Sequence, residues 1–225
     1  MLNAHRGEEP RWHAALAVIA ALAFYVTLPP KVIVGPLWLL PLLVLATLGP
    51  LLVLKPKRHE EAPWQRGLSI LSIAFLNAFN IATIVLLCIW QFSAHYRRPI
   101  SGEALLLAAV EIWFTNVIVY ALWYWEFDGN GPDTRLHTPL ERELQRSDFL
   151  FPQMTLEPDL RERLRWKPRF VDYLFLAFTN ATAFSPADTF PLTHRAKVLM
   201  MGESLASLVT IAIIAGRAVG MIGGS

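Results

Sequence analysis

Among the polar residues inside the hydrophobic runs of this 225-residue chain, five are the first candidates for chemistry. They are Glu111, Asn116, Glu203, Ser207 and Thr210. Ionisable side chains at membrane depth are costly, so each one is a functional hypothesis by default. Of the two acids, Glu111 is the preferred functional candidate.

The last hydrophobic run carries a polar stripe. Four residues spaced by four, three and seven positions fall on one face of a helix: Glu203, Ser207, Thr210 and Arg217. Such a stripe could line a pore or a proton path. Alternatively, Glu203 caps the start of the helix or pairs with a nearby base, Arg195 or Lys197.

Small residues recur every four positions on another face of the same run: Ala212, Gly216, Gly220 and Gly224. Small residues at this spacing allow two helices to approach closely. The pattern predicts helix packing, either within the subunit or at an oligomer interface.

Signatures of soluble enzymes are absent from the sequence. None of the six histidines forms an HxxxH or HExxH pair, and there is no nucleophile elbow, P-loop or GxGxxG motif. The single cysteine, Cys88, excludes an intramolecular disulfide. We therefore expect no enzyme, cofactor, metal or nucleic-acid partner. A membrane enzyme that uses Glu126, Asp128 or Glu111 with a metal is the weakest alternative, because the pair Glu126 and Asp128 suits a solvated helix end.

The elements that must position these residues follow from composition. Hydrophobic residues make up 54% of the chain and charged residues 17%, against about a quarter charged in soluble domains. The apolar residues are grouped into five runs long enough to span a membrane: 12–29, 32–54, 67–92, 103–126 and 196–222. The sequence predicts an all-α, multi-pass integral membrane protein, with an N-terminal three-helix region (1–102) and a second region (103–225).

One sizeable polar region, 127–168, holds eight acidic and seven basic residues. Short helices are expected at 138–146 and 158–166, and the apolar stretch "FLFPQM" (149–154) must be buried. We interpret the region as an ordered surface loop rather than a catalytic domain, and as a candidate docking surface for a protein partner. The aromatic residues "WYW" (123–125) that precede it are expected at the membrane interface.

The stretch "RFVDYLFLAFTNATAF" (169–184) is too short to span, because about 20 residues are needed. Pro186 and Pro191 prevent a simple extension of its helix. Irregular backbone at membrane depth survives only inside protein or beside a water-filled cavity. The sequence therefore predicts a re-entrant helix and loop over 169–188, with an interfacial helix lying flat as the alternative.

The order of helix, short helix, connection and helix over about 103–222, with the phrase "FTNATAFSPADTFPLT", resembles the pore module of tetrameric potassium channels. The phrase is also similar to an uncharacterised family of bacterial membrane proteins. The resemblance implies a homo-oligomer, a tetramer, surrounded by lipids of the cell membrane, here the bacterial inner membrane. It places the following residues in a filter-like segment: Thr182, Ala183, Phe184, Ser185, Pro186, Ala187 and Asp188.

Both glycines of the potassium filter Thr-Val-Gly-Tyr-Gly are missing, so potassium selectivity is not expected. A wider pore ringed by Asp188, or by the hydroxyls of Thr182 and Ser185, is the working hypothesis for an ion-channel-like or transport-related oligomer. The alternative is a non-conducting scaffold that binds a partner or lipid through 127–168.

The basic residues predict an orientation. With a cytoplasmic N-terminus and a re-entrant 169–184, 16 of the 20 Lys and Arg residues lie inside, which the positive-inside rule favours. The loop 127–168 is then cytoplasmic. The channel analogy requires the opposite orientation, so both remain open.

Overall fold

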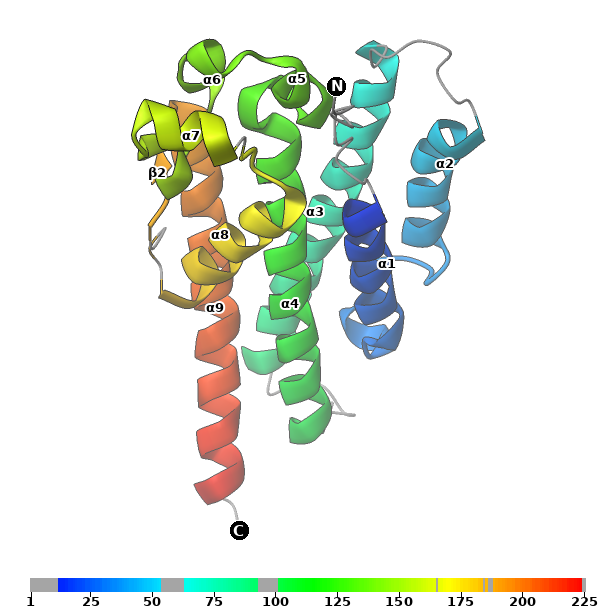
Figure 1. The fold of residues 1–225 in the computed structure, drawn as a ribbon. Coiled ribbons are helices and arrows are strands. Elements are labelled where there is room, and N and C mark those ends of the chain that lie inside the picture. Colours follow the sequence, from blue (N-terminus) through cyan, green and yellow to red (C-terminus); the bar gives the residue numbers. More distant parts are fainter. Residues whose placement is uncertain are drawn as a thin grey trace.

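The computed structural model describes residues 12–53, 63–92, 101–164, 166–183, 185 and 188–223. The chain forms a bundle of long helices with short helices at one end (Figure 1). The long or apolar helices are α1 (Trp12–Thr27), α2 (Leu39–Val53), α3 (Pro63–Phe92), α4 (Gly102–Phe127), α8 (Phe170–Ala183) and α9 (His194–Gly223). The short elements are the 3-10 helices η1 (Pro30–Val32), η2 (Asp128–Asn130) and η3 (Pro152–Thr155), α5 (Pro132–His137), α6 (Leu140–Arg146), α7 (Pro158–Leu164), and the strands β1 (Phe149–Leu150) and β2 (Phe190–Pro191).

Among the described residues, three helices are long and apolar enough to cross a membrane, and they correspond to three of the predicted runs: Trp64–Gln91, Gly102–Asn130 and His194–Val219. A 30-residue helix such as α3 or α9 is about 45 Å long, more than the ~30 Å hydrocarbon core. The helices α1 and α2 are apolar but have only 16 and 15 residues. The membrane-helix character of the chain is confirmed in this coarser form, and the count of five spans stays a prediction.

The second run was predicted to be helical from residue 32, but α2 begins only at Leu39. Gly35 has a positive φ of 72°, which ends any helix, and Pro36 follows it. The carbonyl of Pro36 then accepts the N–H of Leu39 in a turn that leads into α2. The backbone therefore breaks between η1 and α2, which shortens this helix.

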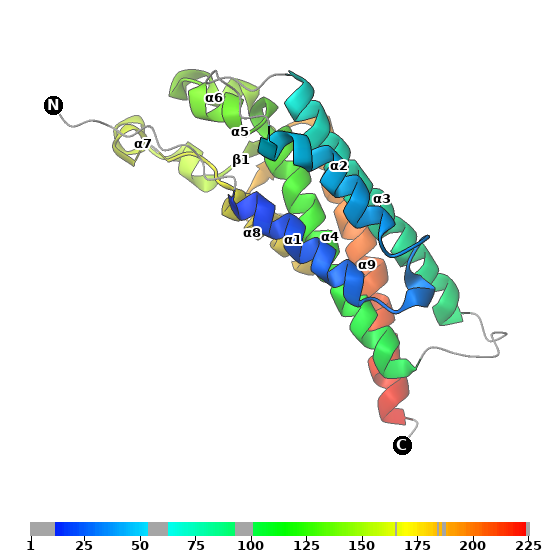
Figure 2. The same cartoon turned by 90° about the vertical axis from the view of Figure 1, so that its right-hand side faces the viewer.

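The helix α4 is the central element of the bundle and contacts α1, α3, α8 and α9. Ser101 caps its start by accepting the N–H of Ala104. Small buried residues, Ala108 and Ala109, let neighbouring helices approach closely. In Figures 1 and 2 the last turns of α9 lie at the opposite end of the bundle from α5 and α6.

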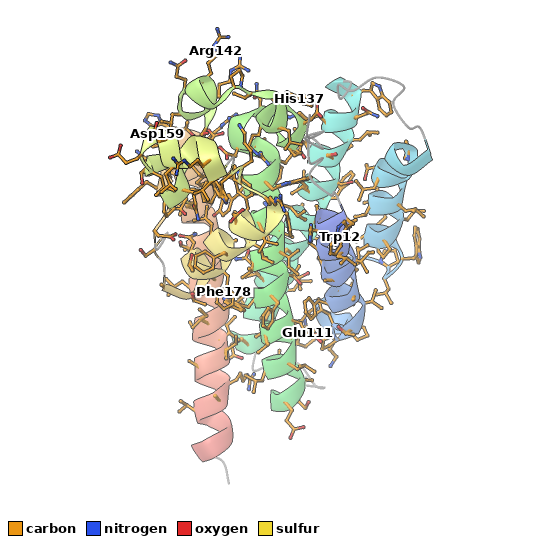
Figure 3. The ribbon with its side chains drawn as sticks, in the orientation of Figure 1. Trp12, Glu111, His137, Arg142, Asp159 and Phe178 are labelled. Carbon is orange, nitrogen blue, oxygen red and sulfur yellow. The ribbon has the colours of Figure 1, made fainter. Side chains whose placement is uncertain are left out.

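The polar cap (residues 128–169) covers the end of the bundle where α4 finishes. Its short helices α6 and α7 lie within the predicted ranges 138–146 and 158–166. The predicted burial of the apolar stretch is confirmed, because Phe149, Phe151 and Met154 are each at most 3% exposed. Arg142, Asp159 and His137 lie on this cap, whereas Glu111 and Phe178 lie part-way along the bundle (Figure 3).

The aromatic residues that end α4 are not in an exposed belt at the membrane interface, as the sequence had suggested. Tyr124 is fully buried, and Trp123 and Trp125 are at most 8% exposed. The ring of Tyr124 packs edge-on against Phe149 of β1, at 5.1 Å between centroids. The folded cap therefore covers these rings and removes them from the interface.

The helix α8 begins beside the polar cap and ends beside the middle of the bundle. Tyr173, in its first turn, donates a hydrogen bond to Asp128 at the end of α4. Near its other end, Phe178 packs against Trp113 in mid-α4, at 5.8 Å between ring centroids. The chain then returns to the cap, because β2 pairs with β1 in antiparallel register, with Leu150 opposite Phe190. Both ends of 169–191 thus lie at the same end of the bundle (Figure 1).

Candidate functional site

A buried carboxylate lies at the meeting point of α4, α8 and α9. Glu203, in the third turn of α9, has no exposed surface. Its Oε2 accepts a hydrogen bond from the Tyr124 hydroxyl at 2.5 Å and another from the Asn180 amide at 2.6 Å. The same amide donates to the carbonyl of Met200, and Ser204 donates to the Asn180 Oδ1. Three helices therefore converge on one acidic group.

A second polar cluster lies next to the first along α4 and α9. The Asn116 amide donates to the Ser207 hydroxyl at 2.9 Å and to the backbone carbonyl of Glu203 at 3.3 Å. Its Oδ1 accepts the amide of Asn80 from α3 at 3.2 Å. Asn80 and Asn116 therefore join α3 to α4 inside the bundle. Each such bond contributes about 0.6 kcal/mol on average in membrane bundles.

The polar stripe of α9 faces the inside of the subunit. Glu203, Ser207 and Thr210 have no exposed surface, and Arg217 donates to Gln91 of α3 at 2.5 Å. Thr210 bonds only carbonyls of its own helix. The stripe is used in packing α9 onto α4 and α3, so it does not face outward to a shared axis.

The sequence-based pairing of Glu203 with Arg195 is wrong. Arg195 donates instead to Asp148 of the polar cap, from Nε at 2.6 Å and from a second nitrogen. The alternative role of Glu203 as a helix cap is also wrong, because its carboxylate bonds Tyr124 and Asn180 across to other helices. The physical reason is position, since Glu203 lies more than two turns into α9, beside the donors of α4 and α8.

Glu111, the preferred acid from the sequence, lies apart from this site. It is half-buried on α4, and its Oε2 is buried without a hydrogen-bond partner among the described residues. Its backbone carbonyl accepts the Thr115 hydroxyl at 2.9 Å. The structure therefore does not join Glu111 to Glu203 or Asn116 through any described hydrogen bond.

The filter-like residues lie at the connection between α8 and β2. Those that the structure describes are exposed: Thr182, Ala183, Ser185 and Asp188. Phe184, Pro186 and Ala187 lie outside the described residues. The Thr182 hydroxyl bonds carbonyls of its own helix, and Asp188 accepts a bond from the Thr189 hydroxyl at 3.1 Å. In a single chain Thr182 and Ala183 are thus exposed at the end of α8, and Ser185 and Asp188 are exposed beyond it.

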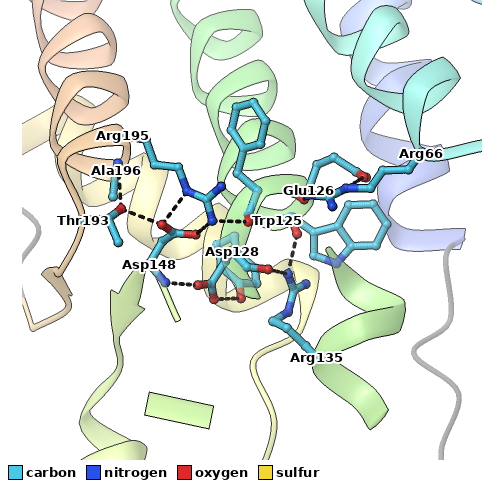
Figure 4. A network of polar contacts seen from close by, with 11 residues as sticks. Arg66, Trp125, Glu126, Asp128, Arg135, Asp148, Thr193, Arg195 and Ala196 are labelled. Atoms are coloured by element: carbon cyan, nitrogen blue, oxygen red, sulfur yellow. Dashed lines mark hydrogen bonds and ion pairs between the residues drawn. The ribbon is translucent and has the colours of Figure 1, made fainter. Parts of the chain in front are cut away.

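Charged groups at the cap fasten three elements together (Figure 4). Asp128 accepts the Asp148 N–H and the Tyr173 hydroxyl, both at 2.5 Å. Arg135 donates to the carbonyls of Trp125 and Asp128, both at 2.6 Å, and lies over the Tyr173 ring. Asp148 bonds Arg195 at the start of α9. These contacts join the end of α4 to the cap and to α9.

The interpretation of Glu126 and Asp128 as a solvated helix end is wrong. Glu126 is 2% exposed and Asp128 is fully buried. Glu126 forms an ion pair with Arg66 of α3 at 3.5 Å. The cap covers this helix end, so its acids bond protein groups and not solvent.

The described residues contain no group of three or more His, Cys, Asp or Glu side chains placed to hold a metal ion. The acids at the cap already accept N–H and O–H donors, and Glu203 accepts two. The arrangement at Glu203 is suited to holding a carboxylate in apolar surroundings by hydrogen bonds.

Comparison with protein-family models, with curated proteins and with solved structures found no match for this chain. The resemblance of 103–222 to a channel pore module therefore stays a prediction.

Two residues of the buried site were not assigned to it from the sequence. Tyr124 was predicted to lie at the membrane interface, and no role was predicted for Asn180. The sequence does carry a sign of burial for each residue. Asn180 is an amide in an apolar helix, and Tyr124 is one turn before the buried Asp128. Their meeting with Glu203 depends on where α8 docks, which spacing along the chain does not specify.

Proposed function

We propose that this chain is a multi-pass integral membrane protein of the bacterial inner membrane that acts as a channel-like or transport-related homo-oligomer without potassium selectivity. In this proposal five segments span the membrane, and 169–188 enters and leaves it from the same side. The observation that carries it is the path of α8, a 14-residue helix that starts and returns at one end of the bundle. At about 21 Å, α8 is too short for a hydrocarbon core of about 30 Å.

The position of the turn after α8 supports a role at a shared axis. Thr182, Ser185 and Asp188 are exposed in the single chain and so are available to neighbouring copies. A ring of carboxylates is a recurring cation-selective element of channels. The proposal therefore places the constriction at 182–188, with Asp188 supplying charge.

The exposed face of α9 supports contact with lipid or with another copy. Val198, Met201, Leu205 and Leu208 are each more than half exposed. A Cβ added at Gly216, further along α9, would meet nothing within 4 Å in the single chain. In the proposed oligomer, a tetramer if the pore-module resemblance holds, this side of α9 lies against lipid or a neighbouring subunit.

The experiment is flux of potassium, sodium and chloride through liposomes that contain the purified protein. We expect cation flux that Asp188→Asn lowers and that Asp159→Asn leaves unchanged. Asp159 is a matched control because it is an exposed aspartate on α7 of the polar cap. No flux of any ion, with the protein folded by circular dichroism, would refute the pore.

A scaffold that binds a protein partner is the second candidate function. Three leucines of the cap helices, Leu144, Leu160 and Leu164, are 43–55% exposed among charged neighbours. Apolar side chains grouped on a polar surface are typical of a docking site. Substituting Leu160 and Leu164 by serine should leave ion flux unchanged if this surface only binds a partner.

A further inference from the structure

The two carboxylate oxygens of Glu203 differ in their hydrogen bonds. Its Oε2 accepts two donors, from Tyr124 and Asn180. Its Oε1 is buried and has no hydrogen-bond partner among the described residues. One oxygen therefore accepts two donors, whereas the other is buried and accepts none from the described residues.

No cation balances this acid in the part of the chain that the structure describes. The nearest bases along α9 are engaged elsewhere or face away: Arg195 pairs with Asp148, and Lys197 is exposed. The titratable groups near Glu203 are Tyr120 and Tyr124 of α4, and the Tyr124 hydroxyl donates to its carboxylate. No described charged side chain of α3, α8 or β2 contacts it.

An ionised carboxylate buried inside a membrane protein is costly unless it is paired. Protonation of Oε1 removes that cost, while Oε2 can keep both of its donors. We propose that Glu203 is a proton-binding site in the core of the subunit, which takes a proton from water at Oε1 and releases it there. The O–H bond forms and breaks at one atom, and Tyr124 and Asn180 hold the carboxylate when the proton leaves.

Polar groups lead from Glu203 in two directions. Ser204, which is half-buried, donates to Asn180 at 3.3 Å near the end of α8. On the other side, the Asn116 amide donates to the backbone carbonyl of Glu203, and its Oδ1 accepts the amide of Asn80, which lines a small pocket between α1, α2, α3 and α4. The hydroxyl of Tyr25 is buried at that pocket without a hydrogen-bond partner among the described residues.

Infrared difference spectroscopy of the purified full chain, between mildly acidic and mildly alkaline buffer, tests the proposal directly. We expect a band of a protonated carboxyl that Glu203→Gln removes and Glu103→Gln keeps. Glu103 is a suitable control because it is exposed in the first turn of α4. Glutamine retains an acceptor for Tyr124 and Asn180, so this variant should fold.

Tyr124→Phe provides a second variant in which the acid remains. It removes one donor from the carboxylate, so the pH midpoint of the band should shift. A band that persists in folded Glu203→Gln overturns the proposal, and so does a midpoint that Tyr124→Phe leaves in place. Neither readout depends on ion flux, so the proton site and the proposed pore can fail independently.

Discussion

The carboxylate of Asp148 is the strongest single link between the polar cap and α9. It is 1% exposed and lies just before β1. Its Oδ1 accepts the Thr193 hydroxyl at 2.5 Å and the Arg195 Nε at 2.6 Å, and its Oδ2 accepts a second nitrogen of Arg195. Asp148→Asn removes the charge but keeps the shape, so it isolates these bonds.

The cost of this substitution can be worked out from the exposure of the two partners. A hydrogen bond to a charged group contributes about 1.5–3 kcal/mol, and breaking a fully buried ion pair costs about 3–5 kcal/mol. The Arg195 side chain is 48% exposed, so water can solvate the guanidinium once the charge is lost. The asparagine amide has one oxygen where the aspartate has two. It therefore either turns its NH₂ group toward Arg195 or leaves one of the present donors without an acceptor. We expect a loss of about 2–3 kcal/mol.

The assay is reversible unfolding in detergent, with Asp159→Asn as the control for removing an aspartate from the cap. Arg195→Gln and the double variant complete a double-mutant cycle. Because the two groups bond directly, the coupling free energy should exceed about 1 kcal/mol. The reasoning is refuted if Asp148→Asn is as stable as Asp159→Asn, or if the effects of Asp148→Asn and Arg195→Gln are additive.

Two further substitutions test the packing around α4. Gly202→Ala would place a Cβ 2.8 Å from the hydroxyl of Tyr120, whose ring is buried, so α9 must move and stability in the same assay should fall by about 1–3 kcal/mol. Gly216→Ala, where nothing lies within 4 Å, should change stability by less than about 0.5 kcal/mol, and equal losses in the two variants would contradict the packing. Tyr173→Phe removes a 2.5 Å bond to a buried carboxylate at the end of α4 and should cost about 1.5–3 kcal/mol, whereas wild-type stability would show that this hydroxyl is not needed.

The helices were predictable because apolar runs of membrane length have few alternatives to a helix. The run predicted at 103–126 became α4, Gly102–Phe127, almost residue for residue. The second run was predicted less well, because a hydropathy pattern does not register that Gly35 needs a positive φ. Hydropathy also did not predict that a folded cap would cover the aromatic end of α4.

The sequence identified some residues of the buried site, but it did not predict which side chains they bond. Glu203 and Ser207 were identified from a helical stripe, and both are buried. Which way the stripe faces depends on the solvent around the bundle. In water the polar face of a helix points outward to the solvent. In a membrane the apolar face contacts lipid, so the polar face can turn to the protein interior. The partners Tyr124 and Asn180 then depend on the docking of α8, which involves contacts distant in sequence.

The inward-facing stripe also limits how a shared-axis pore could be built. Ser207 and Thr210 are fully buried against neighbouring helices of the same chain, so they cannot line a pore between copies. The outward side of α9 presents Met201, Leu205 and Leu208, which would line an axis with apolar groups. A pore so lined closes by losing its water, and the turn at Asp188 would supply a ring of carboxylates. An effect of Asp188→Asn on flux would therefore assign selectivity to that turn, and the acid at Glu203 would serve a path inside each subunit.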